Sequence, residues 1–198
     1  MPEFDSRDPH LPTFWDERFE RGFTPWDRGG VPQALQAFAA AQKRPLRTLI
    51  PGCGAAYELA FLAQAGWDAT AIDFSPAAVA KAREVVGPWG ERVLQADFFT
   101  WQAALPLDLI YERAFLCALP RTMWPQVAAR WAELLAPGAL LAGFFFFDDA
   151  AKGPPFGISA ARLDELLMPY FECIEDAAVA DSIPVFGGRE RWKVWQRK

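Results

Sequence analysis

The stretch Leu46-Arg-Thr-Leu-Ile-Pro-Gly-Cys-Gly-Ala-Ala-Tyr-Glu58 decides the fold of this chain. Leu46 to Ile50 is a short, largely apolar run of the kind that forms a buried strand. Pro51 to Gly54 is a tight glycine turn, and the spacing of apolar residues from Ala55 to Ala65 predicts a helix that Gly66 ends. The order of strand, turn and helix is typical of the first unit of an open α/β sheet, in which ligands lie beyond the carboxyl ends of the strands.

A second unit of strand and helix follows directly. Asp68 to Asp73 predicts a strand, and Ser75-Pro76 supplies an N-cap and a proline for the first position of the next helix. Asp73 therefore stands at the end of the second strand, nineteen residues after Gly54. A carboxylate in that place can accept hydrogen bonds from both ribose hydroxyls of an adenosine-containing ligand.

The rest of the chain continues the alternation of strands and helices. Strands alternating with helices predict a mainly parallel sheet with right-handed crossovers, and the last elements could include an antiparallel edge. We expect strands at 92–96, 107–112, 139–147, 171–180 and 191–196 and helices at 122–135 and 159–167.

Two short helices precede the sheet and form a predicted N-terminal helical cap over residues 1–44. The first is aromatic and ends at Gly22, and Thr13 followed by Asp16 resembles a capping box at its start. The second runs from Pro32 to Gln42 and begins with a proline.

Length and composition favour one soluble domain over residues 1–198, with the core at 45–198. The longest apolar run, Pro137 to Phe147, is far short of a membrane span. Met1 to His10 has neither the basic start nor the apolar stretch of a secretory signal. We therefore predict a cytoplasmic protein, a monomer or weak dimer, without membrane contact.

Charge and residue counts argue against several classes of function. A net charge of -5 with no long basic run leaves little to neutralise phosphates, so a nucleic-acid partner is not expected. Cys53, Cys117 and Cys173 lack the spacing of metal ligands or of a disulfide framework, so we expect no metal and a reducing compartment. The single histidine, His10, lies in a polar N-terminal segment. We expect it to be exposed and do not expect a histidine-based mechanism.

The glycine turn decides between two classes of cofactor. A dinucleotide would need a third glycine three positions after Gly54, so that the helix N-terminus can approach its pyrophosphate, and Tyr57 stands there. A Gly-x-Gly turn without that glycine suits a ligand with no phosphate, of which S-adenosylmethionine is the common one. We predict an S-adenosylmethionine-dependent methyltransferase. A non-catalytic S-adenosylmethionine-binding protein, a NAD(P)-dependent oxidoreductase and a turn that serves packing alone stay as alternatives.

Several motifs together resemble the thiopurine S-methyltransferase family, including its plant relatives that methylate halides and thiols. They are Thr24-Pro25-Trp26-Asp27, Pro51-Gly52-Cys53-Gly54, Ile72-Asp73-Phe74-Ser75, Asp97-Phe98-Phe99, the stretch from Asp108 to Leu119, Gly153-Pro154-Pro155-Phe156 and Asp181-Ser182-Ile183-Pro184. The resemblance covers nearly the whole chain. It implies the Rossmann-like class I methyltransferase fold, a seven-stranded, mainly parallel sheet with helices on both faces. The implied cofactor is S-adenosyl-L-methionine, and its product is S-adenosyl-L-homocysteine.

The resemblance also implies roles for individual residues on the cofactor side. Tryptophan faces would stabilise a sulfonium cation and exclude water. Arg113 would lie where cofactor and acceptor meet, as both a cofactor-binding and a catalytic residue, because a cation there favours an anionic nucleophile. The other implied cofactor-binding residues are Trp15, Trp26, Gly52, Gly54, Asp73, Phe74, Asp97 and Phe98.

Fewer residues can be assigned to the acceptor side of the predicted site. Asp148 and Asp149 follow the strand at 139–147, where they can touch the substrate or take a proton, and we assign Asp148 a catalytic role and Asp149 a substrate-binding role. Phe19 and Phe156 complete the predicted acceptor site. The simpler alternatives are core packing for the tryptophans, an ion pair for Arg113 and solvated turn positions for the two acids.

The identity of the acceptor stays open at this point. A soft nucleophile such as a thiolate ionises near neutral pH and needs no dedicated base, which suits a chain almost without histidine. The arginine at position 113 resembles the residue found in the thiopurine enzymes. The motifs Thr24 to Asp27 and Asp181 to Pro184 instead resemble those of the halide and thiol branch. The expected acceptor is therefore a small molecule, namely a thiol, a thiopurine, a halide or a related anion.

Overall fold

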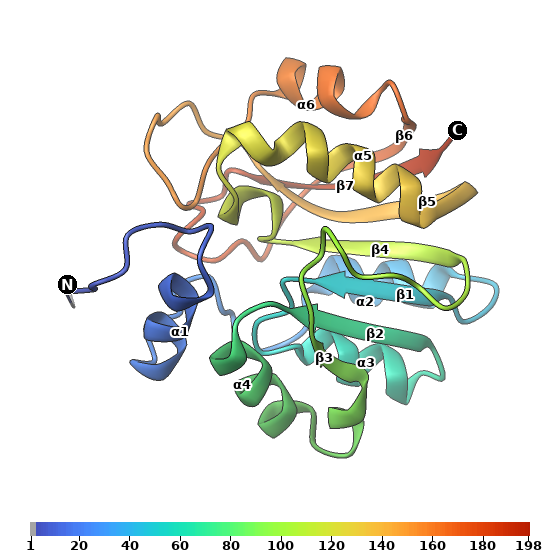
Figure 1. The fold of residues 1–198 in the computed structure, drawn as a ribbon. Helices are drawn as coiled ribbons and strands as arrows, with labels where there is room; N and C mark the ends of the chain where they lie inside the picture. The colour runs from blue at the N-terminus through green and yellow to red at the C-terminus, as the bar shows by residue number, and fades with distance from the viewer. Residues whose placement is uncertain (1–2) are drawn as a thin grey trace.

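The sheet organises the molecule, which a computed structural model describes from residue 3 to residue 198. Met1 and Pro2, which the predicted cap includes, lie outside the described residues. Seven strands form one sheet in the order β3-β2-β1-β4-β5-β7-β6 (Figure 1). They are β1 (Arg47–Pro51), β2 (Asp68–Asp73), β3 (Val93–Gln95), β4 (Leu107–Arg113), β5 (Leu135–Phe146), β6 (Phe171–Ala178) and β7 (Glu190–Arg197).

All neighbouring pairs from β3 to β5 are parallel, and β7 is antiparallel to both β5 and β6. The predicted seven-stranded, mainly parallel sheet is confirmed. The antiparallel strand lies one position inside the edge, and β6 forms the edge itself. Because the chain runs outward from β1 in one direction and from β4 in the other, the point where the strand order reverses lies between these two strands. Ligands of open α/β sheets bind at that point.

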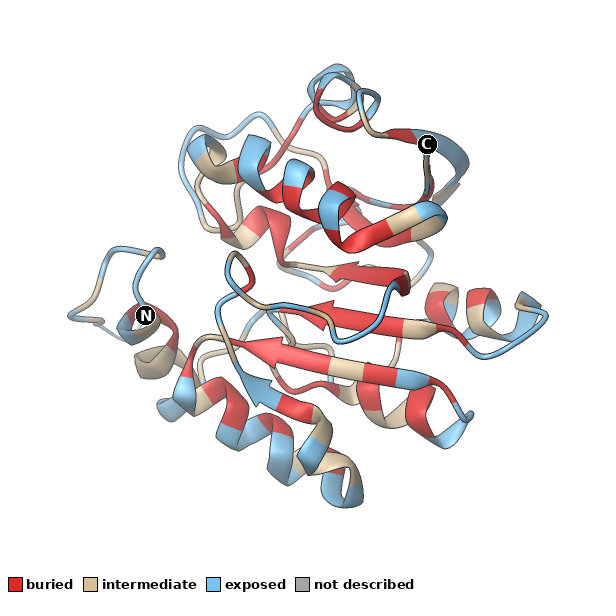
Figure 2. Ribbon diagram, turned by 45° about the vertical axis from the view of Figure 1, so that its right-hand side comes forward, coloured by how far each residue is buried: buried red, intermediate tan, exposed pale blue. Residues whose placement is uncertain are grey.

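Helices cover both faces of the sheet. The helices α2 (Gln33–Ala41), α3 (Tyr57–Gln64) and α4 (Pro76–Val86) pack on one face, and α5 (Trp124–Leu134) and α6 (Ala160–Leu167) pack on the other. β1, β2 and β4 are buried along most of their length, as Figure 2 shows in red. Such continuous burial is what a parallel sheet between two helical layers requires.

The expected helix at 122–135 forms α5, and its buried face includes Trp124, Val127, Ala128 and Trp131. Short 3-10 turns precede this helix, and β5 begins four residues earlier than the expected strand, directly after the helix. The 3-10 turns of the chain are η1 (Gly87–Arg92), η2 (Leu116–Ala118) and η3 (Arg121–Met123). Within residues 3–198, the helices are all too short or too polar to cross a membrane.

The helix α1 (Pro12–Glu20) lies apart from the two layers, at the side of the sheet where β1 and β2 end (Figure 1). The predicted capping box of Thr13 and Asp16 is wrong, since α1 begins at Pro12 without a side-chain cap. The carboxylate of Asp16 instead accepts hydrogen bonds from Ser75 Oγ at 2.6 Å and from the Ala77 amide at 3.1 Å. Asp16 therefore fastens α1 to the N-terminus of α4, where a negative charge is favourable.

Candidate functional site

A cavity of about 680 Å³ opens at the carboxyl ends of β1, β2 and β4. The loops after these strands and after β3 form its floor and walls, and α1 with the N-terminal segment forms a cover. Residues 153–155, Val185 and Phe186 close the far side. The cavity thus occupies the place where the strand order reverses.

The glycine turn presents its backbone to this cavity. Gly52 has a φ of +57°, and a Cβ there would lie 2.6 Å from the ring of Phe115. Gly54 also has a positive φ, +52°. Ala56, the N-cap of α3, adopts the same left-handed region at φ 57° although it has a side chain. Left-handed conformations are unfavourable for non-glycine residues, so the turn is held by the packing around it.

Asp73 lies directly beside the glycine turn, at the end of β2. Its Oδ1 accepts the Ser75 amide at 3.0 Å, and its Oδ2 accepts the Gly54 amide at 3.2 Å. Burial raises the pKa of Asp73 to about 6, although these amides oppose the shift. Each oxygen keeps room for one more donor. Asp73 can therefore accept two adjacent hydroxyl groups, as the sequence predicts.

The loop after β3 supplies the next wall. Phe98 is buried, with its ring 5.0 Å from that of Phe115 in an edge-to-face arrangement. The carboxylate of Asp97 accepts the Phe99 amide at 2.9 Å and thereby holds the turn. Asp97, Phe98 and Phe74, which the sequence predicts to bind the cofactor, all line the cavity.

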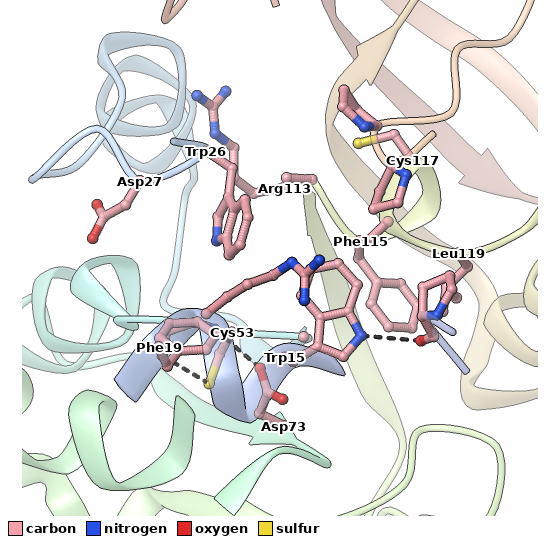
Figure 3. Close-up of a pocket in the computed structure, with 18 of the residues that line it drawn as sticks. Trp15, Phe19, Trp26, Asp27, Cys53, Asp73, Arg113, Phe115, Cys117 and Leu119 are labelled. Atoms are coloured by element: carbon pink, nitrogen blue, oxygen red, sulfur yellow. Dashed lines mark hydrogen bonds between the residues drawn. The ribbon is translucent and has the colours of Figure 1, made fainter. Parts of the chain in front are cut away.

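Three aromatic side chains form the cover. The rings of Trp15 and Trp26 meet edge to face at 5.5 Å, and Phe19 meets Trp26 at 6.1 Å. Trp15 Nε1 donates to the Pro9 carbonyl at 3.0 Å, which fixes the segment before α1. Figure 3 shows Trp15, Phe19 and Trp26 gathered around the same space as Asp73. The structure thus brings together three residues that the sequence places in one site.

Arg113, at the end of β4, carries the positive charge on the opposite wall. Its Nη1 donates to Glu190 Oε1 at 3.0 Å, and its guanidinium carbon lies 4.2 Å from the ring centroid of Phe144. Its Nη2 is buried and has no hydrogen-bond partner within residues 3–198. A buried donor without a partner is costly, so this geometry favours a ligand that accepts from Arg113. The ion pair that the sequence left as an alternative is present, and it leaves part of the guanidinium uncommitted.

Glu58 is a further acid of the wall that sequence reasoning did not single out. It is buried in the first turn of α3, and Tyr111 Oη donates to its Oε1 at 3.4 Å. Burial raises the pKa of Glu58. The signal in the sequence was its place directly after the glycine turn.

Arg28, which directly follows the motif Thr24 to Asp27, contacts the motif Asp181 to Pro184. Arg28 Nη1 donates to Asp181 Oδ2 at 2.6 Å, and the Gln33 amide donates to the same oxygen at 3.1 Å. Ser182 Oγ donates to Glu190 Oε2 at 2.6 Å. The segment after Trp26 is therefore tied to the loop between β6 and β7. Sequence reasoning missed these pairs, and the only available signal was the opposite charge of Arg28 and Asp181.

His10 is exposed, as predicted, yet it also lines the cavity. Its Nδ1 lies 2.7 Å from the carboxylate of Asp8. The pair stands at the outer rim of the cover, because both side chains are about half exposed.

Three predicted acceptor residues lie outside the cavity lining. Asp148 pairs with Arg189 at 2.8 Å. Phe156 packs against the core and against Gly153, although Gly153 to Pro155 do line the cavity. Asp149 does not line it either. The roles assigned to Asp148, Asp149 and Phe156 stay predictions.

The family and the curated relatives that match this chain are all methyltransferases. The family described as Thiopurine S-methyltransferase (TPMT) matches residues 10–198. Thiocyanate methyltransferase 1 of Arabidopsis thaliana is 30% identical over 92% of this chain and 84% of its own length. Probable thiol methyltransferase 2 of the same plant is 31% identical over 90% and 84%. A thiopurine S-methyltransferase of Vibrio cholerae is 29% identical over 79% and 81%.

Solved structures support the fold. The 1,6-didemethyltoxoflavin-N1-methyltransferase of Burkholderia thailandensis, which was solved with bound S-adenosylhomocysteine, matches with a TM-score of 0.77. It is 19% identical, and the match covers 100% of this chain and 93% of that one. A TehB-like SAM-dependent methyltransferase from Corynebacterium glutamicum matches with a TM-score of 0.67 at 15% identity, over 96% and 100%. At these identities the likeness concerns the fold alone.

Proposed function

The chain belongs to the thiopurine S-methyltransferase family, and from this premise we propose how its cavity transfers a methyl group from S-adenosylmethionine to a small soft nucleophile. The protein is a methyltransferase that uses S-adenosylmethionine. The observation that carries the proposal is Arg113, whose buried Nη2 lacks a partner in a cavity that also holds Asp73 and the aromatic cover. The alternatives of an oxidoreductase and of a non-catalytic binding protein find no support in the comparisons.

The residues at the ends of β1, β2 and β3 fit the cofactor. Asp73 keeps one free acceptor position on each oxygen for the ribose hydroxyls, and Asp97 and Phe98 would frame the adenine. Gly52 and Gly54 would lie against the methionine part, because their backbone is open to the cavity. When bound, the cofactor supplies an activated methyl group on a sulfonium sulfur.

The task of the chain is then to place the acceptor and to exclude water. Trp15, Phe19 and Trp26 cover the cavity, and their faces stabilise a sulfonium cation. Arg113 holds the anionic form of the acceptor. With S-adenosylmethionine held by Asp73 and the glycine turn, the cofactor would supply the methyl group to the acceptor beside Arg113 and would leave as S-adenosylhomocysteine. No covalent enzyme intermediate is needed.

The two cysteines of the cavity do not compete for the methyl group. Burial raises the pKa of both Cys53 and Cys117 well above the ordinary value, and nearby acids raise it further. The thiolate is the nucleophile, so both side chains stay unreactive near neutral pH. We also propose a cytoplasmic, reducing location, which suits three cysteines without a disulfide among them, and a monomer or weak dimer.

We propose thiols and thiocyanate as the preferred acceptors, ahead of thiopurines. The two plant relatives, named for thiocyanate and thiol, match over a larger share of this chain than the bacterial thiopurine enzymes do. The Arg28–Asp181 pair connects the residue directly after one motif that resembles the halide and thiol branch, Thr24 to Asp27, with the other, Asp181 to Pro184.

A panel of acceptors tests the proposal. Purified protein with S-adenosylmethionine is offered thiols, thiocyanate, iodide and thiopurines, and S-adenosylhomocysteine is measured over time. We expect the highest kcat/KM with thiols or thiocyanate. Cofactor binding without turnover on any acceptor would refute the enzymatic proposal, and a clear preference for thiopurines would refute the choice of acceptor.

A further inference from the structure

Arg113 is held by a chain of partly buried hydrogen bonds to residues near the other end of the sequence. Glu190, the first residue of β7, is 4% exposed and uses both carboxylate oxygens. Its Oε1 accepts Arg113 Nη1 at 3.0 Å, and its Oε2 accepts Ser182 Oγ at 2.6 Å. Because the two bonds engage opposite oxygens, they fix the rotation of the carboxylate and, through it, the guanidinium.

The segment that carries Ser182 is itself anchored. Asp181 accepts hydrogen bonds from Arg28 and from the Gln33 amide, so the loop cannot shift without breaking an ion pair. The ring of Phe144 lies below the guanidinium and completes its support. A cation that lines the cavity, Arg113, is thus joined by hydrogen bonds to a balancing anion and a hydroxyl behind it.

We propose that Glu190 and Ser182 are positioning residues for the acceptor, which hold Arg113 in one orientation and set how much of its positive charge the acceptor meets. The inference rests on the proposed function, in which Arg113 binds the acceptor as an anion. Ser182 supplies orientation, and Glu190 supplies both orientation and partial neutralisation. The two residues therefore have separable effects.

Other ionisable groups near Arg113 do not blur this separation. Burial keeps the thiol of Cys117 and the phenol of Tyr111 neutral by raising their pKa, and it raises the pKa of Glu112 to about 8. Glu58 faces Arg113 from α3, and burial raises its pKa as well. All four groups are unchanged in the variants below. A difference between variants therefore reports on Glu190 and Ser182.

The test compares Ser182→Ala with Glu190→Gln. Ser182→Ala removes the bond that orients Glu190 but keeps every charge. Glu190→Gln keeps the shape, since the amide oxygen still accepts from Arg113 and the amide nitrogen can donate to Ser182, but it removes the negative charge. Glu190→Ala is avoided because it would leave a buried arginine unpaired. Ser159→Ala is the matched control, because it removes the N-cap of α6 outside the cavity.

The main measurement is kcat for a thiol as a function of pH, together with the dissociation constant of S-adenosylhomocysteine. The acid limb of kcat reports the ionisation of the thiol in the complex. Ser182→Ala should lower kcat/KM by about five- to tenfold and move the acid limb to higher pH by about half a unit. Glu190→Gln should move the limb to lower pH by about half a unit, because the charge of Arg113 is less compensated. Affinity for S-adenosylhomocysteine should change less than about twofold in both variants.

Opposite shifts of the acid limb in the two variants distinguish a positioning role from a loss of structure. A merely structural role would make both variants resemble Ser159→Ala, with lower stability and an unmoved acid limb, and that result would overturn the proposal. If the wild type formed no product with any thiol, the proposed function would fail first. In that case calorimetry can still measure the affinity of thiocyanate for the S-adenosylhomocysteine complex, which depends on the orientation and charge of Arg113. It should weaken in Ser182→Ala and tighten in Glu190→Gln, and equal affinities would refute the inference.

Discussion

The two halves of the cavity are built by different means. Apart from the aromatic cover, the cofactor half uses backbone turns and the carboxylates of Asp73 and Asp97, and its residues lie between Gly52 and Phe98, at the ends of adjacent parallel strands. The acceptor half uses side chains from distant segments, held by the pairs Arg28–Asp181 and Arg113–Glu190. Local backbone geometry fixes the first half, whereas ion pairs between remote parts of the chain fix the second. A change in one half should therefore leave the other largely intact.

The largest expected effect belongs to Asp73→Ala, in the cofactor half. The substitution removes the acceptors of both ribose hydroxyls in a buried place, so affinity for S-adenosylhomocysteine should fall by about 100-fold or more. Isothermal calorimetry measures the affinity, and circular dichroism checks the fold. Asp73→Asn is the isosteric control and should lose less, because one carbonyl oxygen remains. Binding within threefold of the wild type in Asp73→Ala would show that the ribose lies elsewhere.

A pH series tests the same carboxylate without a mutation. Burial raises the pKa of Asp73 to about 6, and the ribose hydroxyls bind its ionised form better. The free protein takes up a proton as pH falls through that value, so the dissociation constant of S-adenosylhomocysteine should rise by about tenfold between pH 7.5 and pH 5. Tight binding is thus present above the pKa and lost below it. Asp73→Asn should show a flat profile over this range, and an equally flat wild type would contradict the assignment.

The cofactor half was predictable because its signals are local. Gly54 and Asp73 are nineteen positions apart and meet because parallel pairing of β1 with β2 places their ends side by side. The acceptor half was less predictable from the sequence, because its contacts join distant segments. Arg113 and Glu190 are 77 positions apart, and no periodicity indicates that they pair. Arg28 and Asp181 are 153 positions apart, and only their opposite charges could have suggested a contact.

Asp16 shows a different kind of error, in which a local sequence pattern predicted the wrong partner. Its spacing from Thr13 imitates a capping box, but the carboxylate finds better partners at Ser75 and Ala77 on another helix. A local pattern gives the right kind of interaction here, a carboxylate at a helix N-terminus, and the wrong helix. Tertiary packing decides between such equivalent partners.

Arg28→Ala tests the acceptor half. The pair with Asp181 is mostly buried, so its loss should lower the free energy of unfolding by about 1–2 kcal/mol and loosen the loop that carries Ser182. The KM of the acceptor should rise, while affinity for S-adenosylhomocysteine should stay within about twofold. Denaturant unfolding and steady-state kinetics measure these changes.

Arg44→Ala is the matched control for that substitution. It removes an ion pair with Asp108 at the amino end of β4, where Arg44 is largely exposed. It should cost less than about 1 kcal/mol and leave the kinetics unchanged. If Arg28→Ala weakened cofactor and acceptor binding equally, the two halves would not be independent.

The smallest expected effect compares one strained residue from each half. Ala56 and Ala114 both have a φ of 57°, where glycine is favoured. Ala114→Gly should raise the free energy of unfolding by about 0.5–1 kcal/mol, because relief of strain exceeds the added freedom of the unfolded chain. Ala56→Gly should raise the free energy of unfolding by less. Ala56 is 1% exposed and packs in the core, so the loss of its buried methyl group offsets the relief of strain. Denaturant unfolding of both variants gives the difference. A larger gain at Ala56 than at Ala114 would mean that the glycine turn carries more strain than its packing stabilises, and that the cofactor half is the more strained of the two.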